Sequence, residues 1–191
     1  DVIGTLSSQA EKMGLDSVIL TGDRDTFQLI SPKVRVDLAS SIQDRRVYDE
    51  AELSERYSGL TASQQTDFKA LLGDTSDNIP GVPKVGPKTA VRWLKEYGSL
   101  DRLVAQADSV PGKVGENLRA SLDQLPLSHQ LATVKCDVAL EEGPADLKIG
   151  TPDDDALRHL YAELEFKTWL AELGGLNEAD QEDGRDSAQY E

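Results

Sequence analysis

The stretch from Gly73 to Thr89, GDTSDNIPGVPKVGPKT, constrains the fold of this 191-residue chain more than any other part. It places two acidic residues three positions apart, then a turn rich in Gly and Pro, then lysines at the start of an apolar-periodic segment. Pro87 suits the first position of a helix and Gly98 the position just after its end, so we expect one helix over Pro87–Tyr97. A glycine hairpin ahead of a helix presents backbone N–H groups toward an anion, and Lys84 and Lys88 add positive charge there.

A nucleotide-binding P-loop is the main alternative for this segment. That motif requires a Gly directly followed by a Lys. Here Pro87 separates Gly86 from Lys88, and its missing N–H removes a phosphate donor. We therefore favour a helix–hairpin–helix that holds the backbone of a duplex, a contact that is indifferent to base sequence.

Two pairs of carboxylates accompany the hairpin: Asp23 with Asp25, and Asp74 with Asp77. Two like charges about 4 Å apart repel by roughly 4 kcal/mol at an effective dielectric of 20, so converging carboxylates need a cation. Oxygen ligands favour Mg²⁺ or Mn²⁺, and two such ions can support in-line attack on a phosphodiester. The alternative is purely local: Asp25 and Asp77 cap short helices while Asp74 forms an Asx-turn.

The first part of the chain has an α/β pattern. Apolar residues at helical spacing lead to Gly14, and SVILT at 17–21 and the alternating segment 34–38 are expected strands. The pair Asp23 and Asp25 then follows the carboxyl end of a strand, where ligands of open α/β sheets usually bind. Asp1 lies near a helix N-terminus, where it is either a cap or a ligand.

From Asp49 onward, helices dominate the pattern. Capping boxes are expected at Asp49 with Glu52 and at Thr61 with Gln64. The segment 110–117, VPGKVGEN, is either a second hairpin or a turn with a basic residue, and we favour the turn. Further expectations are a helix over 127–134, an edge strand at 138–140, and a last helix from Thr151 that packs on the body through its apolar residues (Leu157, Leu160, Tyr161, Leu164 and Trp169).

Some reactive side chains have ordinary structural explanations. Asp153–Asp155 are expected to stabilise a helix N-terminus through its dipole rather than to bind a metal. His129 is expected to be structural, and Cys136 is expected to be a small packing residue. The sequence beyond 174 is acidic and lacks an apolar period, which indicates a linker or disordered tail.

The composition limits the class of protein. The net charge of −15 argues against a polyanionic partner, but residues 79–122 carry seven Lys/Arg against four Asp/Glu, so a local basic patch is expected. The single Cys and the short apolar runs fit a reducing compartment and no bilayer crossing, so we expect a cytoplasmic protein. Since the chain begins with Asp1 rather than Met, we expect it to be cut from a longer protein.

Three segments together resemble the 5′-nuclease (flap endonuclease) family that includes a domain of bacterial DNA polymerase I. They are TGDRD at 21–25, GDTSDNIPGVPKVGPKTA at 73–90 and LSHQLATVKCDVAL at 127–140. The resemblance covers nearly all of residues 1–170. It implies an α/β fold: a partial PIN-like or Rossmann-like core over residues 1–48, then a mainly helical region with a helix–hairpin–helix (H3TH) over 49–170, with 171–191 as an acidic linker.

The resemblance also implies roles for individual residues. It assigns Asp1 to a first metal site and Asp23, Asp25, Asp74 and Asp77 to a second site, with Mg²⁺ or Mn²⁺ as the ions. The hairpin would hold duplex DNA, with K⁺ bound by its backbone, and the candidate contacts are Gly81, Lys84, Gly86, Lys88, Thr89 and Arg92. The expected activity is 5′-3′ exonuclease and flap endonuclease cleavage, with removal of RNA primers and flaps, in a polypeptide that continues into proofreading and polymerase domains.

One departure from the family limits this expectation. Most first-site acids and the arch that threads the flap are absent from the 191 residues, so the isolated chain is expected to be inactive or nearly so. The alternatives are a standalone 5′-nuclease without a polymerase, and a non-catalytic module that binds duplex DNA through the hairpin alone.

Overall fold

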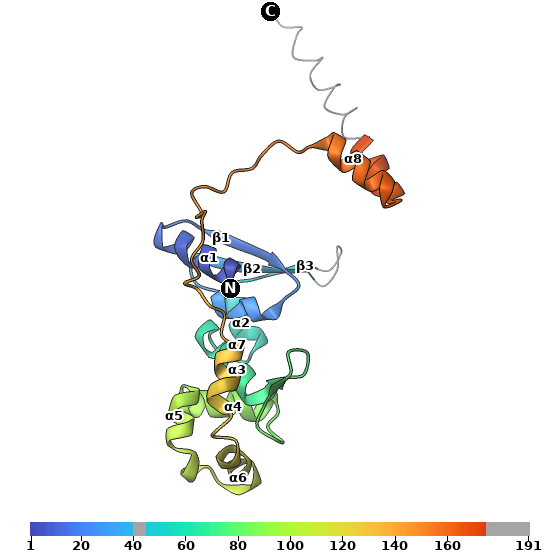
Figure 1. The fold of residues 1–191 in the computed structure, drawn as a ribbon. Coiled ribbons are helices and arrows are strands. Elements are labelled where there is room, and N and C mark those ends of the chain that lie inside the picture. The colour runs from blue at the N-terminus through green and yellow to red at the C-terminus, as the bar shows by residue number, and fades with distance from the viewer. Residues whose placement is uncertain (40–44, 175–191) are drawn as a thin grey trace, which may run out of the picture. The chain divides into compact units, whose positions relative to one another are not determined.

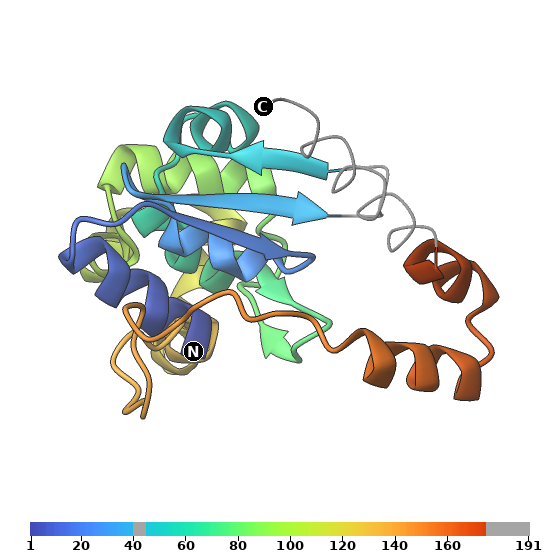
Figure 2. The same ribbon diagram turned by 90° about the horizontal axis from the view of Figure 1, so that it is seen from above.

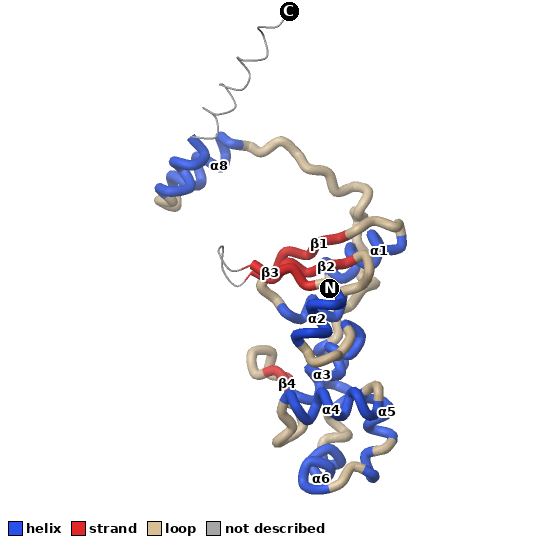
Figure 3. The backbone as a smooth tube through the Cα atoms, turned by 180° about the vertical axis from the view of Figure 1, so that it is seen from behind, coloured by secondary structure: helices blue, strands red, loops and turns tan. Residues whose placement is uncertain are grey.

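The computed structural model describes residues 1–39 and 45–174, which divide into two compact units between Leu147 and Lys148. The first unit holds a small sheet and a helical region, as Figures 1 and 3 show. Within the described ranges, no helix combines the length and apolar content that a bilayer crossing requires.

The sheet consists of β1 (Ser17–Thr21), β2 (Val34–Ala39) and β3 (Arg45–Tyr48) in that order. β1 and β2 are parallel, with Ser17 opposite Val34, and β3 is antiparallel to β2, with Tyr48 opposite Val36. The arrows in Figure 2 show these directions. The strands expected at 17–21 and 34–38 are thus confirmed.

One face of the sheet forms a core with the short helix η1 (Arg24–Leu29) and with α2 (Glu50–Arg56). Phe27 and Leu53 are fully buried there, and the ring of Phe27 lies 4.7 Å from that of Tyr48. Because side chains alternate along a strand, Val18 and Leu20 of β1 point away from this core and are 56% and 62% exposed.

Helix α1 (Val2–Lys12) precedes the sheet, and Gly14 follows it with φ +77°, which confirms the expected stop. The segment after residue 132 returns to this helix. The N–H of Val138 donates to Oγ1 of Thr5 at 3.1 Å. The edge strand expected at 138–140 is therefore wrong, since this segment bonds to a helix side chain instead of a strand.

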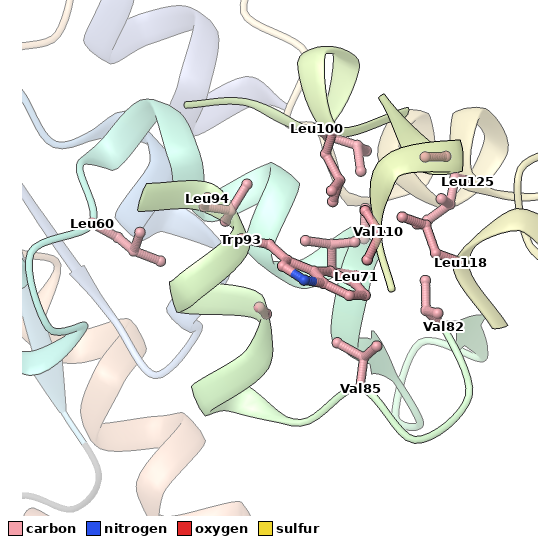
Figure 4. Close-up of a cluster of buried hydrophobic side chains, with 14 residues drawn as sticks. Leu60, Leu71, Val82, Val85, Trp93, Leu94, Leu100, Val110, Leu118 and Leu125 are labelled. Carbon is pink, nitrogen blue, oxygen red and sulfur yellow. The ribbon is translucent and has the colours of Figure 1, made fainter. Parts of the chain in front are cut away.

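The helical region of the first unit begins at α2. Its further elements are η2 (Ala62–Gln64), α3 (Gln65–Leu72), β4 (Gly73–Asp74), β5 (Ile79–Pro80), α4 (Pro87–Tyr97), α5 (Leu100–Ala105), η3 (Ala107–Ser109), α6 (Gly112–Ala120) and α7 (Leu125–Ala132). Trp93 of α4, 2% exposed, is packed among Leu71, Leu94 and Val110 in the core of this region (Figure 4). The helix Pro87–Tyr97 has the bounds that the sequence predicts.

Of the two capping boxes that the sequence predicts, one is present in the structure. Asp49 caps α2 by accepting from the N–H of Ala51 and Glu52, but Glu52 pairs with Arg46 rather than completing a capping box. At η2, Oε1 of Gln64 accepts from the N–H of Thr61 at 3.1 Å, as a capping box requires.

The segment 110–117 is neither a second hairpin nor only a turn. After Pro111 it becomes helix α6, which begins at Gly112. Val110 is buried, and its carbonyl lies so close to Gly115 that a Cβ there would approach it to 1.9 Å. This close packing explains why Gly115 can lie within a helix despite its low helix propensity.

The second unit contains α8 (Asp154–Glu163), whose first turn is capped by Asp153 through the N–H of Ala156 at 2.9 Å. Asp153–Asp155 therefore lie where a helix dipole favours acids, as expected. Tyr161, Phe166 and Trp169 pack against one another in this unit. Packing of α8 on the rest of the chain and the domain limits at 48 and 170 stay predictions, and the tail from 175 onward lies outside the described residues.

Candidate metal centre and nucleic-acid interface

Asp23 and Asp25 lie directly beyond the carboxyl end of β1. The N–H of Asp23 donates to Oγ1 of Thr21 at 3.0 Å, and Oδ1 of Asp23 accepts from the N–H of Asp25 at 2.9 Å. Asp23 is thus the cap of η1, and the alternative that Asp25 is the cap is wrong. The carboxylate of Asp25 is left to face the neighbouring elements.

Asp74 ends β4, and Asp77 lies in the loop between β4 and β5. Oδ1 of Asp74 accepts from the N–H of Ser76 at 2.8 Å and from the N–H of Asp77 at 3.3 Å, while the hydroxyl of Ser76 also donates to it. The predicted Asx-turn therefore exists. It occupies Oδ1 and leaves Oδ2 of Asp74 to point elsewhere.

The two acidic pairs meet in one cleft of about 620 Å³, which is lined by Asp23, Asp25, Asp74 and Asp77 among other residues. Lys69, in the last turn of α3, lies among these carboxylates. Its Nζ lies 2.5 Å from Oδ2 of Asp25, 3.0 Å from Oδ2 of Asp74 and 2.8 Å from Oδ2 of Asp77. Segments about fifty residues apart are therefore brought to one point, which spacing alone could not show.

These contacts change the acidities in the cleft. Burial opposes the charge of Lys69, but its hydrogen bonds to Asp25, Asp77 and Asp74 outweigh burial and raise its pKa. Burial raises the pKa of Asp25 despite the nearby ammonium. The hydroxyl of Ser76, followed by Lys69, lowers the pKa of Asp74. The contacts in the cleft thus favour the charged forms of Lys69 and Asp74.

Sequence reasoning missed Lys69. A signal was available, because a basic residue four positions before Gly73 lies on the last helical turn ahead of the GDTSDN loop. Side chains in that turn can reach the loop that follows, but lysines on helix surfaces are too common for the pattern to single this one out.

Asp1 is not among the residues that line this cleft. Its Oδ1 accepts from the N–H of Lys135 at 2.8 Å, and it makes no side-chain cap of α1. The structure thus ties Asp1 to the segment after α7. Its assignment to a first metal site stays a prediction.

The donor set of the cleft fits a hard divalent cation, because carboxylate oxygens are the ligands that Mg²⁺ and Mn²⁺ prefer. In the described part of the chain, no group of three or more His, Cys, Asp or Glu side chains is arranged as a ready metal site. The ammonium of Lys69 lies at the point on which Asp25, Asp74 and Asp77 converge. The residue types fit the ion, while their present geometry suits the ammonium.

The hairpin between β5 and α4 follows the acidic loop directly. The N–H of Val82 donates to the carbonyl of Leu71 at 2.9 Å, and a Cβ on Gly81 would approach the Leu72 carbonyl group to 2.2 Å. Gly81 therefore serves close backbone packing. Around Gly86 the space is open, and Lys84, Lys88 and Arg92 are exposed, while Thr89 is half-buried.

Two carbonyls of this hairpin accept hydrogen bonds from side chains of neighbouring elements. Asn117 donates to the carbonyl of Pro83 at 2.7 Å, and Gln124 donates to that of Gly81 at 3.2 Å. These bonds fix the hairpin onto α6 and the residue preceding α7. Binding of K⁺ by the hairpin backbone stays a prediction.

Carboxylates beyond the carboxyl end of a strand lie where ligands of open α/β sheets usually bind, and lysines at a helix start suit contacts to phosphates. Comparison with known families specifies the class. Residues 1–58 match the family described as "5'-3' exonuclease, N-terminal resolvase-like domain", and residues 60–155 match "5'-3' exonuclease, C-terminal SAM fold". The chain belongs to the 5′-3′ exonuclease family.

Curated relatives are DNA polymerases I. The enzyme of Caldicellulosiruptor bescii is 41% identical over 177 residues, which are 91% of this chain and 21% of that protein. The thermostable DNA polymerase I of Thermus filiformis is 43% identical over 175 residues, again 91% of this chain and 20% of the relative. The chain thus spans about a fifth of the length of these polymerases.

Among solved structures, the T5 D15 protein co-crystallised with metal ions is similar, with a TM-score of 0.62 and 25% identity, over 69% of this chain and 48% of that protein. The similarity confirms the predicted fold class, an α/β 5′-nuclease core followed by a mainly helical region.

Proposed function

We propose that this chain supplies the second metal site and the duplex-binding hairpin of a structure-specific 5′-3′ exonuclease and flap endonuclease that acts on DNA. The observation that carries the proposal is the convergence of Asp25, Asp74 and Asp77 from two distant segments on one point. The hairpin with Lys84 and Lys88 follows the acidic loop in the chain. The matched relatives are named as DNA polymerases, which supports DNA as the substrate.

In this proposal the cleft binds the metal and the hairpin binds the duplex. Asp23, Asp25, Asp74 and Asp77 would hold Mg²⁺ or Mn²⁺, and the bound ion would supply an activated water and charge stabilisation for in-line phosphodiester hydrolysis. The cap from Asp23 and the Asx-turn of Asp74 fix the backbone that carries these carboxylates. The hairpin contacts Gly81, Lys84, Gly86, Lys88, Thr89 and Arg92 position the duplex through its phosphates without reading bases, with K⁺ as an optional bridge.

The substrates that we propose for this nuclease are 5′ flaps and RNA primers, which would be cut near the junction of single and double strands. In the full-length protein this part would be joined to proofreading and polymerase domains, in line with its share of the matched polymerases. Asp1 is the residue that we assign to the first site. A first site needs more ligands than one carboxylate, so we expect the isolated chain to cleave weakly or not at all.

A non-catalytic duplex-binding module is the second candidate. It is favoured by one observation: the ammonium of Lys69 partly neutralises Asp25, Asp74 and Asp77. In that case the hairpin alone would be functional, and the carboxylates would serve only to hold Lys69 and the loop.

Cleavage of a 5′-labelled flap substrate with Mg²⁺ distinguishes the two candidates. The chain would be compared with a version extended at its N-terminus by the preceding part of a matched polymerase, and with the extended version carrying Asp74→Ala. The control is Asp123→Ala, which removes an exposed acid outside the cleft. We expect the extended protein and its control to cut and Asp74→Ala to be inactive. Salt-dependent duplex binding without cleavage by any version would favour the non-catalytic module.

A further inference from the structure

Lys69 is held more closely than an ordinary surface lysine. Its side chain is 14% exposed, and its Nζ lies within 3.0 Å of oxygens from Asp25, Asp74 and Asp77. An ammonium has three N–H donors and accepts no hydrogen bond. Each donor can therefore be matched by one carboxylate, so that the loop of Asp74 and Asp77 is joined to the strand end of Asp25.

We infer that Lys69 is an internal counter-ion that competes with the divalent cation for Asp25, Asp74 and Asp77, so that metal binding requires its ammonium to leave. This inference rests on the proposed function, since it assumes that a divalent cation binds in the cleft. It assigns to Lys69 the role of setting how tightly that cation is bound.

Competition follows from the individual oxygens. Oδ1 of Asp74 is occupied by the N–H groups of Ser76 and Asp77, so Oδ2 is the oxygen left for a metal. Lys69 contacts that same Oδ2, and it also contacts Oδ2 of Asp25 and Oδ2 of Asp77. A Mg²⁺ ion must approach its oxygens to about 2.0–2.1 Å. An ion and an ammonium that share these oxygens would lie close enough to repel each other strongly.

The net negative charge of the cleft favours the divalent cation over the ammonium of Lys69. One ammonium against Asp25, Asp74 and Asp77 leaves an excess of negative charge, and Asp23 lines the same cleft. A divalent ion neutralises more of that charge. Lysine carries its charge on a flexible stem of four carbons, so the ammonium can leave while the helix stays in place. A smaller cavity of about 160 Å³, lined by Gln28, Gln65 and Lys69 itself, adjoins the stem.

Mn²⁺ titration followed by electron paramagnetic resonance tests the inference on the 191-residue chain. Lys69→Met removes the ammonium and keeps the length of the side chain. The matched control is Lys33→Met, which removes one positive charge from an exposed pair with Asp16. We expect the Mn²⁺ dissociation constant to fall at least tenfold in Lys69→Met and to stay within twofold in Lys33→Met.

The outcomes separate this inference from the proposed function. An unchanged or weaker affinity of Lys69→Met, with measurable binding by the unmodified chain, would overturn the role of Lys69 and leave the metal site standing. Absence of Mn²⁺ binding by every version would overturn both.

A second measurement avoids the substitution, because Lys69→Met leaves carboxylates uncompensated and could fail to fold. Nitrogen-detected lysine NMR on the unmodified chain follows the Nζ resonances during Mg²⁺ titration. Displacement predicts that the Lys69 signal shifts and that its N–H protons exchange faster with water, while Lys33 is unaffected. A Lys69 signal that stays unchanged at saturating Mg²⁺ would contradict displacement.

Discussion

Nε2 of His129 lies 3.1 Å from Oδ1 of Asp67, while Oδ2 of Asp67 accepts from the N–H of Leu100 at 3.0 Å. Asp67 belongs to α3, Leu100 begins α5 and His129 lies in α7, so one carboxylate joins three helices. Asp67 is 8% exposed, and burial raises its pKa. This contact supports the structural role predicted for His129, which stays a prediction.

Asp67→Ala should lower the free energy of unfolding by about 1–3 kcal/mol, because a buried N–H at the start of α5 loses its acceptor. Urea unfolding at neutral pH measures this loss. Asp123→Ala removes an exposed acid and should change stability by no more than about 0.5 kcal/mol. Equal effects of the two substitutions would mean that Asp67 does not join these helices.

Ser76→Ala should make the stability of the metal-free chain depend less on pH in the acid range. Hydrogen bonds, first from Ser76 and then from Lys69, lower the pKa of Asp74 below the ordinary 3.8. A carboxyl group whose pKa is lower in the folded than in the unfolded chain stabilises the fold at pH values above the unfolded-state pKa. This stabilisation is lost as the pH falls below about 4. Without the hydroxyl, the pKa of Asp74 should rise toward its ordinary value, and unfolding free energy should fall less steeply between pH 4 and pH 2.

The control for this pH dependence is Ser109→Ala, whose hydroxyl donates to the backbone carbonyl of Gln106 at 2.7 Å. This variant loses a hydrogen bond that involves no titrating group, so its free energy of unfolding should be lowered by the same amount at each pH. If Ser76→Ala behaved in the same way, the hydroxyl would not be what holds the Asp74 carboxylate ionised.

Gly81 and Gly86 should respond differently to alanine. A Cβ on Gly81 would lie 2.2 Å from the backbone of Leu72, whereas one on Gly86 would meet no atom within 4 Å. Overpacking of this kind costs about 1–3 kcal/mol or more, so Gly81→Ala should lower the melting temperature while Gly86→Ala leaves it nearly unchanged. A matching loss in both variants would show that the hairpin is constrained at Gly86 by something other than packing.

The sequence predicts the regular elements of this fold better than its irregular ones. The spacing of apolar residues and the positions of Pro and Gly predicted the helix Pro87–Tyr97 and the strands at 17–21 and 34–38, because these signals act locally. The segment 110–117 and the proposed strand at 138–140 were mispredicted. The first depends on close packing of Gly115 against the Val110 carbonyl, which helix propensity does not register. The second depends on a bond from Val138 to the distant Thr5.

The candidate site was predictable in residue type but not in geometry. The sequence indicated Asp25, Asp74 and Asp77 as carboxylates of interest, because their motif is unusual. Their convergence depends on the packing of η1, α3 and the β4–β5 hairpin, which no local pattern records. Lys69 was missed for the same reason, since its reach into the cleft is a tertiary contact.

Removal of the hairpin lysines should weaken duplex binding without changing its sequence preference. Lys84 is exposed in the turn before α4 and Lys88 in the first turn of that helix, and contacts from such lysines to phosphates carry no base information. In Lys84→Ala with Lys88→Ala, the slope of log affinity against log salt should fall by roughly 2, about one for each phosphate that is no longer neutralised. Fluorescence anisotropy on duplexes of different sequence measures both effects.

The control for the lysine pair is Lys33→Ala, which removes an exposed cation from the sheet end of the same unit. Its salt slope should match that of the unmodified chain. An equal decrease in the control would assign the effect to net charge rather than to the hairpin.

Mn²⁺ binding to variants of the cleft tests the central claim most directly. Asp25→Asn with Asp74→Asn removes two proposed ligands, and Asp153→Asn with Asp154→Asn makes the same change of charge at the start of α8. We predict that the first pair weakens Mn²⁺ binding at least tenfold and that the second leaves it unchanged. Equal affinities in the two double variants, or no binding by the unmodified chain, would contradict a metal site in this cleft.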